Sequence, residues 1–269
     1  MSSDPGRIER AARFYYDIHR GKKPLPPAPT PPEIRDASLD EAYAMQEALQ
    51  ALFVPERGPI AGYKIAITTP VMQQLMAIDR PMAGAIFAKT VHRSPASLRH
   101  GDYGRIAVEC EIAVRLGSDL PARERPYTRQ DVAGAVEACL PAIELIEDHG
   151  CDAYKQVGSR GLIANNAWNA GAVLGPAVTA WRDIDLAAIP GAMAINGAEI
   201  GRGHGRDVMN GHPFHALAWV ANTVAGRGRP LRRGMIVLTG SVVATQWPKP
   251  GDTVTVSFAG LGEASARFA

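Results

Sequence analysis

One stretch of alternating residues limits the folds open to this chain more than any other. Residues 105–117 read RIAVECEIAVRLG, and this period of two is typical of a β-strand. One face would carry only apolar side chains, those of Ile106, Val108, Cys110, Ile112 and Val114. A wholly apolar face must be buried, so we expect this strand to lie in a sheet that covers a hydrophobic core.

The other face of the same strand carries two acids. Glu109 and Glu111 are two residues apart, so both side chains project from one face, with their α-carbons roughly 7 Å apart. A solvated face would explain such a pair. However, the flanking Ala107 and Ala113 are small, and a third acid, Glu144, sits inside the apolar strand pattern PAIELI. A charge there is costly unless it is paired or bound to a metal.

Three carboxylates from two strands are the kind of ligand set that a hard cation prefers. Mg²⁺ and Mn²⁺ take oxygen ligands in octahedral geometry, with water or substrate in the remaining positions. No histidine or cysteine shares the strand faces that carry these acids, which disfavours zinc. The sequence therefore offers Glu109, Glu111 and Glu144 as candidate ligands of Mg²⁺ or Mn²⁺.

The remaining patterns divide the chain unevenly. The expected elements are helices over 7–20, 38–53, 128–140 and 213–225, a proline-rich connector over 24–33, and strands over 62–68, 83–88 and 142–148. Ser38 and Glu41 form a capping box, and Pro141 is expected to end the third helix. Short strands dominate after residue 171. We therefore expect an N-terminal helical cap over 1–60 and a single globular unit over 61–269.

Composition narrows the function classes. Of the 269 residues, 46% are hydrophobic and 21% are charged, and the net charge is only +2, so no strong field favours nucleic acid or an anionic membrane. No apolar run reaches the roughly 18 residues of a membrane span, and the first residues carry acids and lack the apolar core of a signal peptide. Three cysteines without a CxxC pair fit a reducing compartment. We expect a cytoplasmic protein.

Several separate motifs agree on one family. In order they are GYKIAITTPVMQQLMAIDRPMAGAIFA, VECEIAVRLGSDL, PAIELIED, LIANNAWNAGAVLG, LTGSV and PGDTVTVSFAGLGEASARF. From about residue 40 to the end, the chain resembles the 2-keto-4-pentenoate hydratase and 2-oxo-3-hexenedioate decarboxylase branch of the fumarylacetoacetate hydrolase superfamily. The resemblance implies an α/β fold, a mixed β-roll of the fumarylacetoacetase C-terminal type with an N-terminal helical segment, and a homo-oligomer.

The resemblance also implies roles for particular residues. The site residues that it implies are Lys64, Glu109 and Lys155 for catalysis, Asp79, Asn165 and Ser241 for substrate binding, and Glu109, Glu111 and Glu144 for Mg²⁺ or Mn²⁺. Substrates of this branch are 2-oxo or 2-hydroxy enoic acids, whose C1 carboxylate and C2 oxygen can chelate one metal. The metal would stabilise negative charge on the C2 oxygen. A desolvated lysine near a cation can shuttle protons close to neutral pH, and Lys64 is the first candidate.

The chain departs from the family pattern at three places. Met82 stands where hydratases of this branch usually carry an acid, although Asp79 is nearby. The family's D-N-A-S motif reads Asn165-Asn166-Ala167-Trp168, which places a much larger side chain at the serine position. His149 replaces the arginine of a D-S-R run and is expected in a surface loop. We therefore expect an altered pocket shape.

Four functions remain open. Hydration of a 2-hydroxy-2,4-dienoate in the breakdown of aromatic compounds comes first, and decarboxylation of a 2-oxo-3-hexenedioate, favoured by Met82, comes second. Hydrolysis of a carbon–carbon bond in an acylpyruvate would need a base such as His19. A non-catalytic subunit in a complex with a related pathway enzyme is the fourth. The expected small-molecule partner is a 2-oxo or 2-hydroxy enoic acid, with neither nucleic acid nor a membrane involved.

Overall fold

The strand expected over residues 105–117 is β5 (Ile106–Leu116), the centre of the larger sheet. The computed structural model describes residues 5–22, 30–150 and 154–269. All five side chains of the predicted apolar face, Ile106, Val108, Cys110, Ile112 and Val114, are buried. The prediction that this face belongs to the core is therefore confirmed.

The strands form two mixed sheets, each of which contains both parallel and antiparallel pairs. The larger sheet has seven strands in the order β2-β1-β10-β5-β6-β7-β3. Its other strands are β1 (Ile60–Ala66), β2 (Met82–Phe87), β3 (Val91–Arg93), β6 (Val136–Glu147), β7 (Asn169–Leu174) and β10 (Ile236–Ser241). β1 runs parallel to β10, whereas β5 runs antiparallel to both β10 and β6. The predicted mixed α/β class is confirmed.

The smaller sheet covers the apolar face of the larger one. Its order is β4-β12-β11-β8-β9. The strands are β4 (Ala96–Leu98), β8 (Pro190–Ile195), β9 (Ala198–His204), β11 (Thr253–Phe258) and β12 (Gly262–Phe268). Val256, Phe258 and Phe268 join Val108 and Ile112 in one buried cluster, so burial of both inner faces drives the packing.

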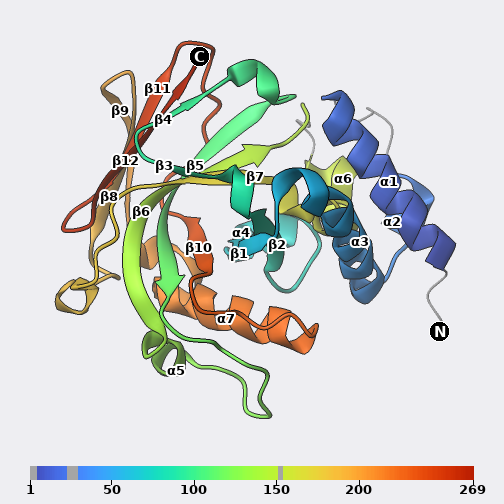
Figure 1. Ribbon diagram of the computed structural model, residues 1–269, viewed down its shortest axis with the longest axis horizontal. Helices are drawn as coiled ribbons and strands as arrows, with labels where there is room; N and C mark the ends of the chain where they lie inside the picture. Colours follow the sequence, from blue (N-terminus) through green and yellow to red (C-terminus); the bar gives the residue numbers. More distant parts are fainter. Residues whose placement is uncertain (1–4, 23–29, 151–153) are drawn as a thin grey trace.

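Helices flank the larger sheet, and those of the N-terminal part gather with α6 (Tyr154–Ala164) at the end of the molecule opposite the smaller sheet. The other helices are α1 (Pro5–Gly21), α2 (Pro32–Arg35), α3 (Leu39–Arg57), α4 (Pro70–Leu75), α5 (Arg129–Ala133) and α7 (Pro213–Gly226). Figure 1 shows α1–α3 beside α6 at one end of the long axis and the five-stranded sheet at the other. α3 begins with the predicted capping box of Ser38 and Glu41. Most of the proline-rich connector lies outside the described residues, and Pro32 begins α2.

The helix expected over residues 128–140 is wrong in its length. α5 ends at Ala133, and β6 then runs from Val136 straight through Pro141. Residues 136–140 pair with β5 and are mostly buried, so sheet pairing prevails over the helical pattern of a short apolar run. Pro141 has no N–H to donate, but its carbonyl accepts a hydrogen bond from the Gly175 amide.

No helix among the described residues has both the length and the apolar character needed to cross a bilayer. The expected boundary between residues 60 and 61 falls next to the turn that joins Arg57, the last residue of α3, to Ile60, the first of β1. The division into a cap and a globular unit stays a prediction.

Candidate metal and substrate site

The three predicted carboxylates meet on the two central strands. Glu109 on β5 lies directly opposite Glu144 on β6, and Glu111 lies two residues further along β5. One oxygen from each of the three lies within 4.8 Å of the others. Glu111 and Glu144 are fully buried and Glu109 is half-buried. The strand register therefore brings together the acids that the sequence pattern selected.

Neighbouring strands supply hydrogen bonds that hold each carboxylate in place. Lys64 Nζ on β1 lies 3.0 Å from Glu144 Oε1, which also accepts a bond from Asn169 Nδ2 on β7 at 3.1 Å. The Gly240 amide donates to Glu111 Oε2 at 2.7 Å. The Thr245 hydroxyl donates to Glu109 Oε1 at 2.5 Å. These contacts come from four separate segments, so the geometry depends on the complete sheet.

Two carboxylate oxygens within this group have no hydrogen-bond partner in the described part of the chain. They are Glu111 Oε1 and Glu144 Oε2, and both are buried. Burial, together with the charges of the neighbouring acids, raises the pKa of Glu111 well above its ordinary value. Burial also raises the pKa of Glu144, against the opposing effect of Lys64. Three acids against one lysine leave excess negative charge, and the unsatisfied oxygens fit a divalent cation.

Lys64 is held inside this group by opposing effects. Its side chain is only 3% exposed, and burial alone would disfavour its charge. The nearby carboxylates, led by Glu144, outweigh burial and hold the pKa of Lys64 above its ordinary value. Lys64 is therefore a protonated amine when the three acids carry their charges and no metal balances them.

A cavity of about 210 Å³ opens beside the carboxylates. It is lined by residues of β1 and the segment after it, by α4 and α6, and by the segments around Trp168 and Ser241. Lys64 and Glu109 both line it, so a small acid inside would meet a cation and the candidate metal ligands together. This volume suits a short-chain ligand.

Two of the predicted substrate-binding residues lie outside the cavity lining, while the third belongs to it. Asp79 is exposed and pairs with Arg80 at 2.7 Å. Asn165 is fully buried and bonds to His19 at 2.8 Å. Ser241 lines the cavity, but its hydroxyl donates to the Val243 carbonyl at 2.6 Å. The structure therefore brings Ser241 to the carboxylates and does not bring Asp79 there.

The structure leaves the Lys155 prediction untested and places Met82 away from the cavity. Lys155 belongs to the first turn of α6, but its side chain lies outside what the structure describes. Met82 is fully buried in a hydrophobic cluster and does not line the cavity. Packing alone accounts for Met82, so its apolar character gives no support to decarboxylation.

Sequence reasoning missed two residues that contact the acids. Asn169 donates to Glu144, and its own Oδ1 is buried without a hydrogen-bond partner among the described residues. Thr245 donates to Glu109 from a loop after β10. Asn169 follows the NNAW motif, and this polar residue at the start of an apolar strand was a usable signal. Nothing local marks Thr245.

His149 is buried, so its expected place in a surface loop is wrong. It is 1% exposed, and it stacks edge-on against His19 at 4.3 Å between ring centroids. Burial, followed by the charge of His19, lowers the pKa of His149 to about 4. Glu147 lies 3.4 Å from His19 Nδ1 and 3.8 Å from His149 Nδ1. Burial would raise the pKa of Glu147, but both histidines and the Gly104 amide outweigh it and lower that pKa to about 2.

These three side chains are a structural cluster rather than a second cation site. Their ligand atoms lie within 4.8 Å of one another. However, Arg57 Nη2 approaches His19 Nδ1 at 3.5 Å, and its charge already acts on Glu147. A divalent cation would add positive charge beside the half-buried guanidinium of Arg57. The cluster instead ties α1 and α3 to the end of β6.

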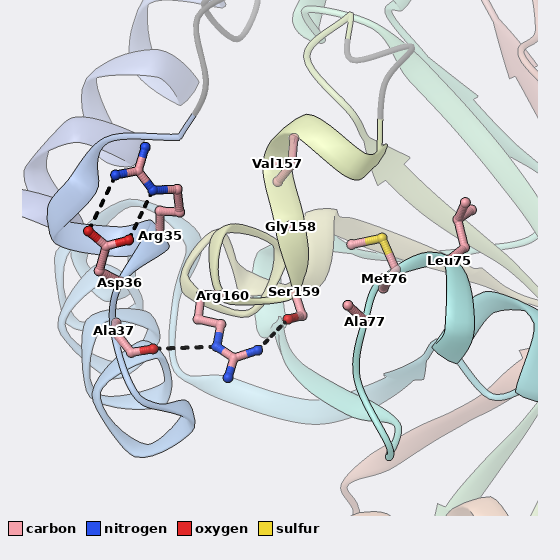
Figure 2. A pocket seen from close by; sticks show the side chains of 10 residues that line it. All are labelled: Arg35, Asp36, Ala37, Leu75, Met76, Ala77, Val157, Gly158, Ser159 and Arg160. Carbon is pink, nitrogen blue, oxygen red and sulfur yellow. Dashed lines mark hydrogen bonds and ion pairs between the residues drawn. The ribbon is translucent and has the colours of Figure 1, made fainter.

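A larger cavity of about 590 Å³ lies apart from the acids. Figure 2 shows it between the end of α2, the end of α4 and α6. Arg35 pairs with Asp36, and Arg160 donates to Ser159 at 2.9 Å, so the charged groups there are engaged with neighbours. Its described lining residues include no cluster of carboxylates, and its size alone does not make it the reactive site.

Comparison with known proteins agrees with this geometry. The family described as fumarylacetoacetate (FAA) hydrolase C-terminal matches residues 73–269. The chain belongs to the fumarylacetoacetate hydrolase family. The match covers the three acids, and it confirms the resemblance inferred from the sequence motifs.

Individual relatives extend the likeness over nearly the whole chain. A 2-keto-4-pentenoate hydratase of Paraburkholderia phymatum is 32% identical over 266 residues, 99% of each chain. A 2-oxo-hept-4-ene-1,7-dioate hydratase of Escherichia coli is 31% identical over 241 residues, 88% of each. The solved 4-oxalocrotonate decarboxylase of Pseudomonas putida G7, complexed with magnesium and adipate, has a TM-score of 0.90 at 22% identity, covering 100% of this chain and 99% of that one. This last likeness establishes the fold.

Proposed function

We propose that this chain is a metal-dependent hydro-lyase that adds water to a 2-hydroxy-2,4-dienoate. The observation that carries the proposal is the group of three acids beside a cavity, with a buried lysine and two buried oxygens that have no partner in the described part of the chain. Hydratases among the relatives, at 31–33% identity over most of the chain, favour hydration over the other lyase reactions.

In this proposal Glu109, Glu111 and Glu144 hold Mg²⁺ or Mn²⁺. The bound cation would supply Lewis-acid stabilisation of charge on the C1 carboxylate and the C2 oxygen. Thr245 and Gly240 orient two of the ligands through hydrogen bonds, and Asn169 orients the third. Such supporting bonds keep carboxylates in a productive geometry.

Lys64 would hold and move a proton at its Nζ atom. It lies at the cavity wall, within 3.0 Å of Glu144, so a proton can pass between the amine and a substrate above the acids. The overall reaction adds one water. The 2-hydroxyl loses its proton and C5 gains one. The hydroxide of the water bonds to C4 and the proton of the same water bonds to C3, which yields a 4-hydroxy-2-oxo acid. Apolar lining residues keep other water out.

The setting of the enzyme is part of the same proposal. Cys110 and Cys139 are free and buried, which suits a reducing cytoplasm. Burial raises the pKa of Cys139 to about 12, so its thiol is unreactive. We propose a homo-oligomer on the basis of the family resemblance, and its partner is a small 2-oxo or 2-hydroxy enoic acid.

The assay that tests this function separates two reactions. Purified protein with Mg²⁺ or Mn²⁺ is incubated with 2-hydroxypenta-2,4-dienoate and, separately, with 2-oxohex-3-enedioate. Ultraviolet absorbance follows the conjugated acid, and released carbon dioxide is measured in parallel. We expect the dienoate to disappear without carbon dioxide. Release of carbon dioxide from the enedioate, with no loss of the dienoate, would show that the enzyme is a decarboxylase and not a hydratase.

Variants of the acids test the site. We expect Glu109→Gln and Glu111→Gln to lower turnover by more than about 100-fold and to weaken Mn²⁺ binding measured by calorimetry. Glu137→Gln is the matched control, because Glu137 lies on β6 but is exposed and pairs with Arg115. Unchanged turnover in both site variants would contradict the assignment.

A further inference from the structure

The cavity beside the acids has two chemically different walls. Its polar lining is made by Lys64, Glu109, Thr245 and neighbouring groups that contact the carboxylates. Its apolar lining is drawn from a different packed cluster, which includes Ile67, Ile146, Leu162, Ala167 and Trp168. A substrate whose acid end lies at the carboxylates must therefore place its tail against this apolar wall.

Trp168 is the largest side chain of that wall, and the backbone holds it in place. Asn166, Ala167 and Trp168 all have positive φ values, of 52°, 48° and 58°. Bulky residues such as Trp168 rarely adopt this conformation unless their surroundings impose it. Here the Asn166 side chain accepts from the Ala85 amide at 2.8 Å and donates to the Ala85 carbonyl at 2.9 Å.

The same turn connects the wall to the candidate metal ligands. Trp168 is followed directly by Asn169, whose side chain donates to Glu144 at 3.1 Å. The indole is 3% exposed and packs in the apolar cluster, so it has little room to turn aside. The backbone and the packing therefore fix the distance between the acids and the indole, and this distance stays the same whichever ligand binds.

We propose that Trp168 limits the length of the substrate tail. The inference rests on the proposed function and deepens it. The cavity accepts 2-hydroxy-2,4-dienoates with a short uncharged tail and rejects long ones, because a longer chain would collide with the indole. Lys64 is the sole cationic side chain among the described lining residues, and it is engaged with Glu144. A second carboxylate on the tail would therefore lose its hydration without gaining a partner.

The test measures binding as well as turnover. The full-length protein is loaded with Mn²⁺ and titrated calorimetrically with 2-oxopentanoate, 2-oxoheptanoate and 2-oxononanoate. These saturated acids keep the C1 carboxylate and the C2 oxygen but cannot be hydrated. For the native chain we expect affinity to fall steeply as the acid lengthens. In Trp168→Ala the ratio of affinities for the longest and the shortest acid rises by roughly tenfold or more.

Two further variants keep the test decisive if Trp168→Ala folds poorly. Trp168→Phe removes less volume and should shift the ratio in the same direction by a smaller factor. Trp181→Phe is the matched control, since Trp181 is buried in the other core cluster and does not line the cavity, so the ratio should not change. Mn²⁺ binding should be equal in all three variants, because none replaces an acid.

The possible results distinguish failure of the role proposed for Trp168 from failure of the proposed hydratase function. A chain-length preference that is identical in the native chain and in both Trp168 variants overturns the role of Trp168 and leaves hydration standing. Failure of the Mn²⁺-loaded native protein to bind any of the three acids, together with no turnover of the dienoate, overturns both. A steep preference that relaxes in both Trp168 variants and not in Trp181→Phe supports the role of Trp168.

Discussion

At the scale of single residues, the site depends on how buried charges are balanced. Lys64 is the one cation in contact with Glu144 among the described residues, and both side chains are almost completely buried. Removing one member of a buried pair leaves the other uncompensated. The excess negative charge of the three acids is also what favours a cation. Lys64 and a bound metal ion thus partly compensate the same carboxylates, although only the lysine is proposed to carry a proton.

Lys64→Met separates these two roles. The substitution keeps the apolar stem of the side chain but removes its charge. We expect Mn²⁺ binding, measured by calorimetry, to be as tight as in the native chain or tighter, since a repelling cation is gone. Turnover of the dienoate should fall by about 100-fold or more, because the proton carrier is lost.

Lys89→Met is the matched control for this prediction, because Lys89 is exposed and its loss should leave both quantities unchanged. Native turnover in Lys64→Met would refute the assignment of Lys64 to proton transfer. Loss of Mn²⁺ binding with the fold intact would show instead that the lysine orders the ligands.

At the scale of elements, a left-handed turn before β7 joins the helical end to the sheet. Its Asn166 side chain bonds to Ala85 on β2 and accepts from Gln50 on α3 at 3.0 Å. Gln46 on α3 bonds to the Ala83 and Ile163 carbonyls at 2.8 and 2.7 Å. Buried side-chain amides on α3 thus bond to backbone carbonyls that are left unpaired by the helices and strands. These hydrogen bonds compensate the strain of the turn.

We expect Asn166→Ala to destabilise the protein by at least about 2 kcal/mol. Several buried groups lose a hydrogen-bond partner, and each orphaned group costs about 1–3 kcal/mol. Urea unfolding with an unchanged denaturant slope would measure this loss. Asn210→Ala provides the comparison, since Asn210 is also left-handed but exposed, and should cost less than about 1 kcal/mol. Equal costs in the two variants would mean that the buried bonds contribute nothing beyond backbone strain.

At the scale of the whole molecule, a buried cluster of charges links the N-terminal helices to the sheet. His149 is faced by His19 from α1, Arg57 from α3, and by Glu147 and Asp148 beside it. His149 must stay neutral in the folded state, since burial lowers its pKa from 6.5 to about 4. The unfolded chain therefore binds more protons than the folded chain between these pH values.

Stability should accordingly fall as the pH drops from about 6.5 to about 4. Each pKa unit corresponds to 1.36 kcal/mol, so His149 contributes up to about 3 kcal/mol of this loss. Protonation of Glu147 extends the loss from about pH 4.5 to about 2, because its folded pKa lies near 2. Burial also lowers the pKa of His212 to about 4, so this residue adds to the loss of stability between pH 6.5 and 4.

His149→Asn should remove part of the loss between pH 6.5 and 4, and asparagine tolerates the left-handed backbone at that position. Urea unfolding at several pH values would measure it. His204→Asn is the control, since His204 is less buried and lies on β9. If the variant and the native chain lost stability in parallel, the titration of His149 would not be responsible.

Local patterns were enough to predict much of this protein. The period of two along β5 placed Glu109 and Glu111 on one face and five apolar residues on the other, because side chains alternate along any strand. The isolated acid Glu144 in an apolar strand marked the third member of the group, since such a charge needs a partner. The capping box of α3 and the family membership also followed from contiguous residues.

Contacts between distant segments were decided only by the tertiary structure. β1 lies beside β10, and β10 beside β5, so the neighbours of the acids come from residues far apart in the chain. That order puts Lys64 against Glu144 and Thr245 against Glu109, and no local period encodes it. Pairing with β5 turned the expected helix after Ala133 into a strand. His149 was buried for the same reason, since burial depends on which other elements pack above a residue.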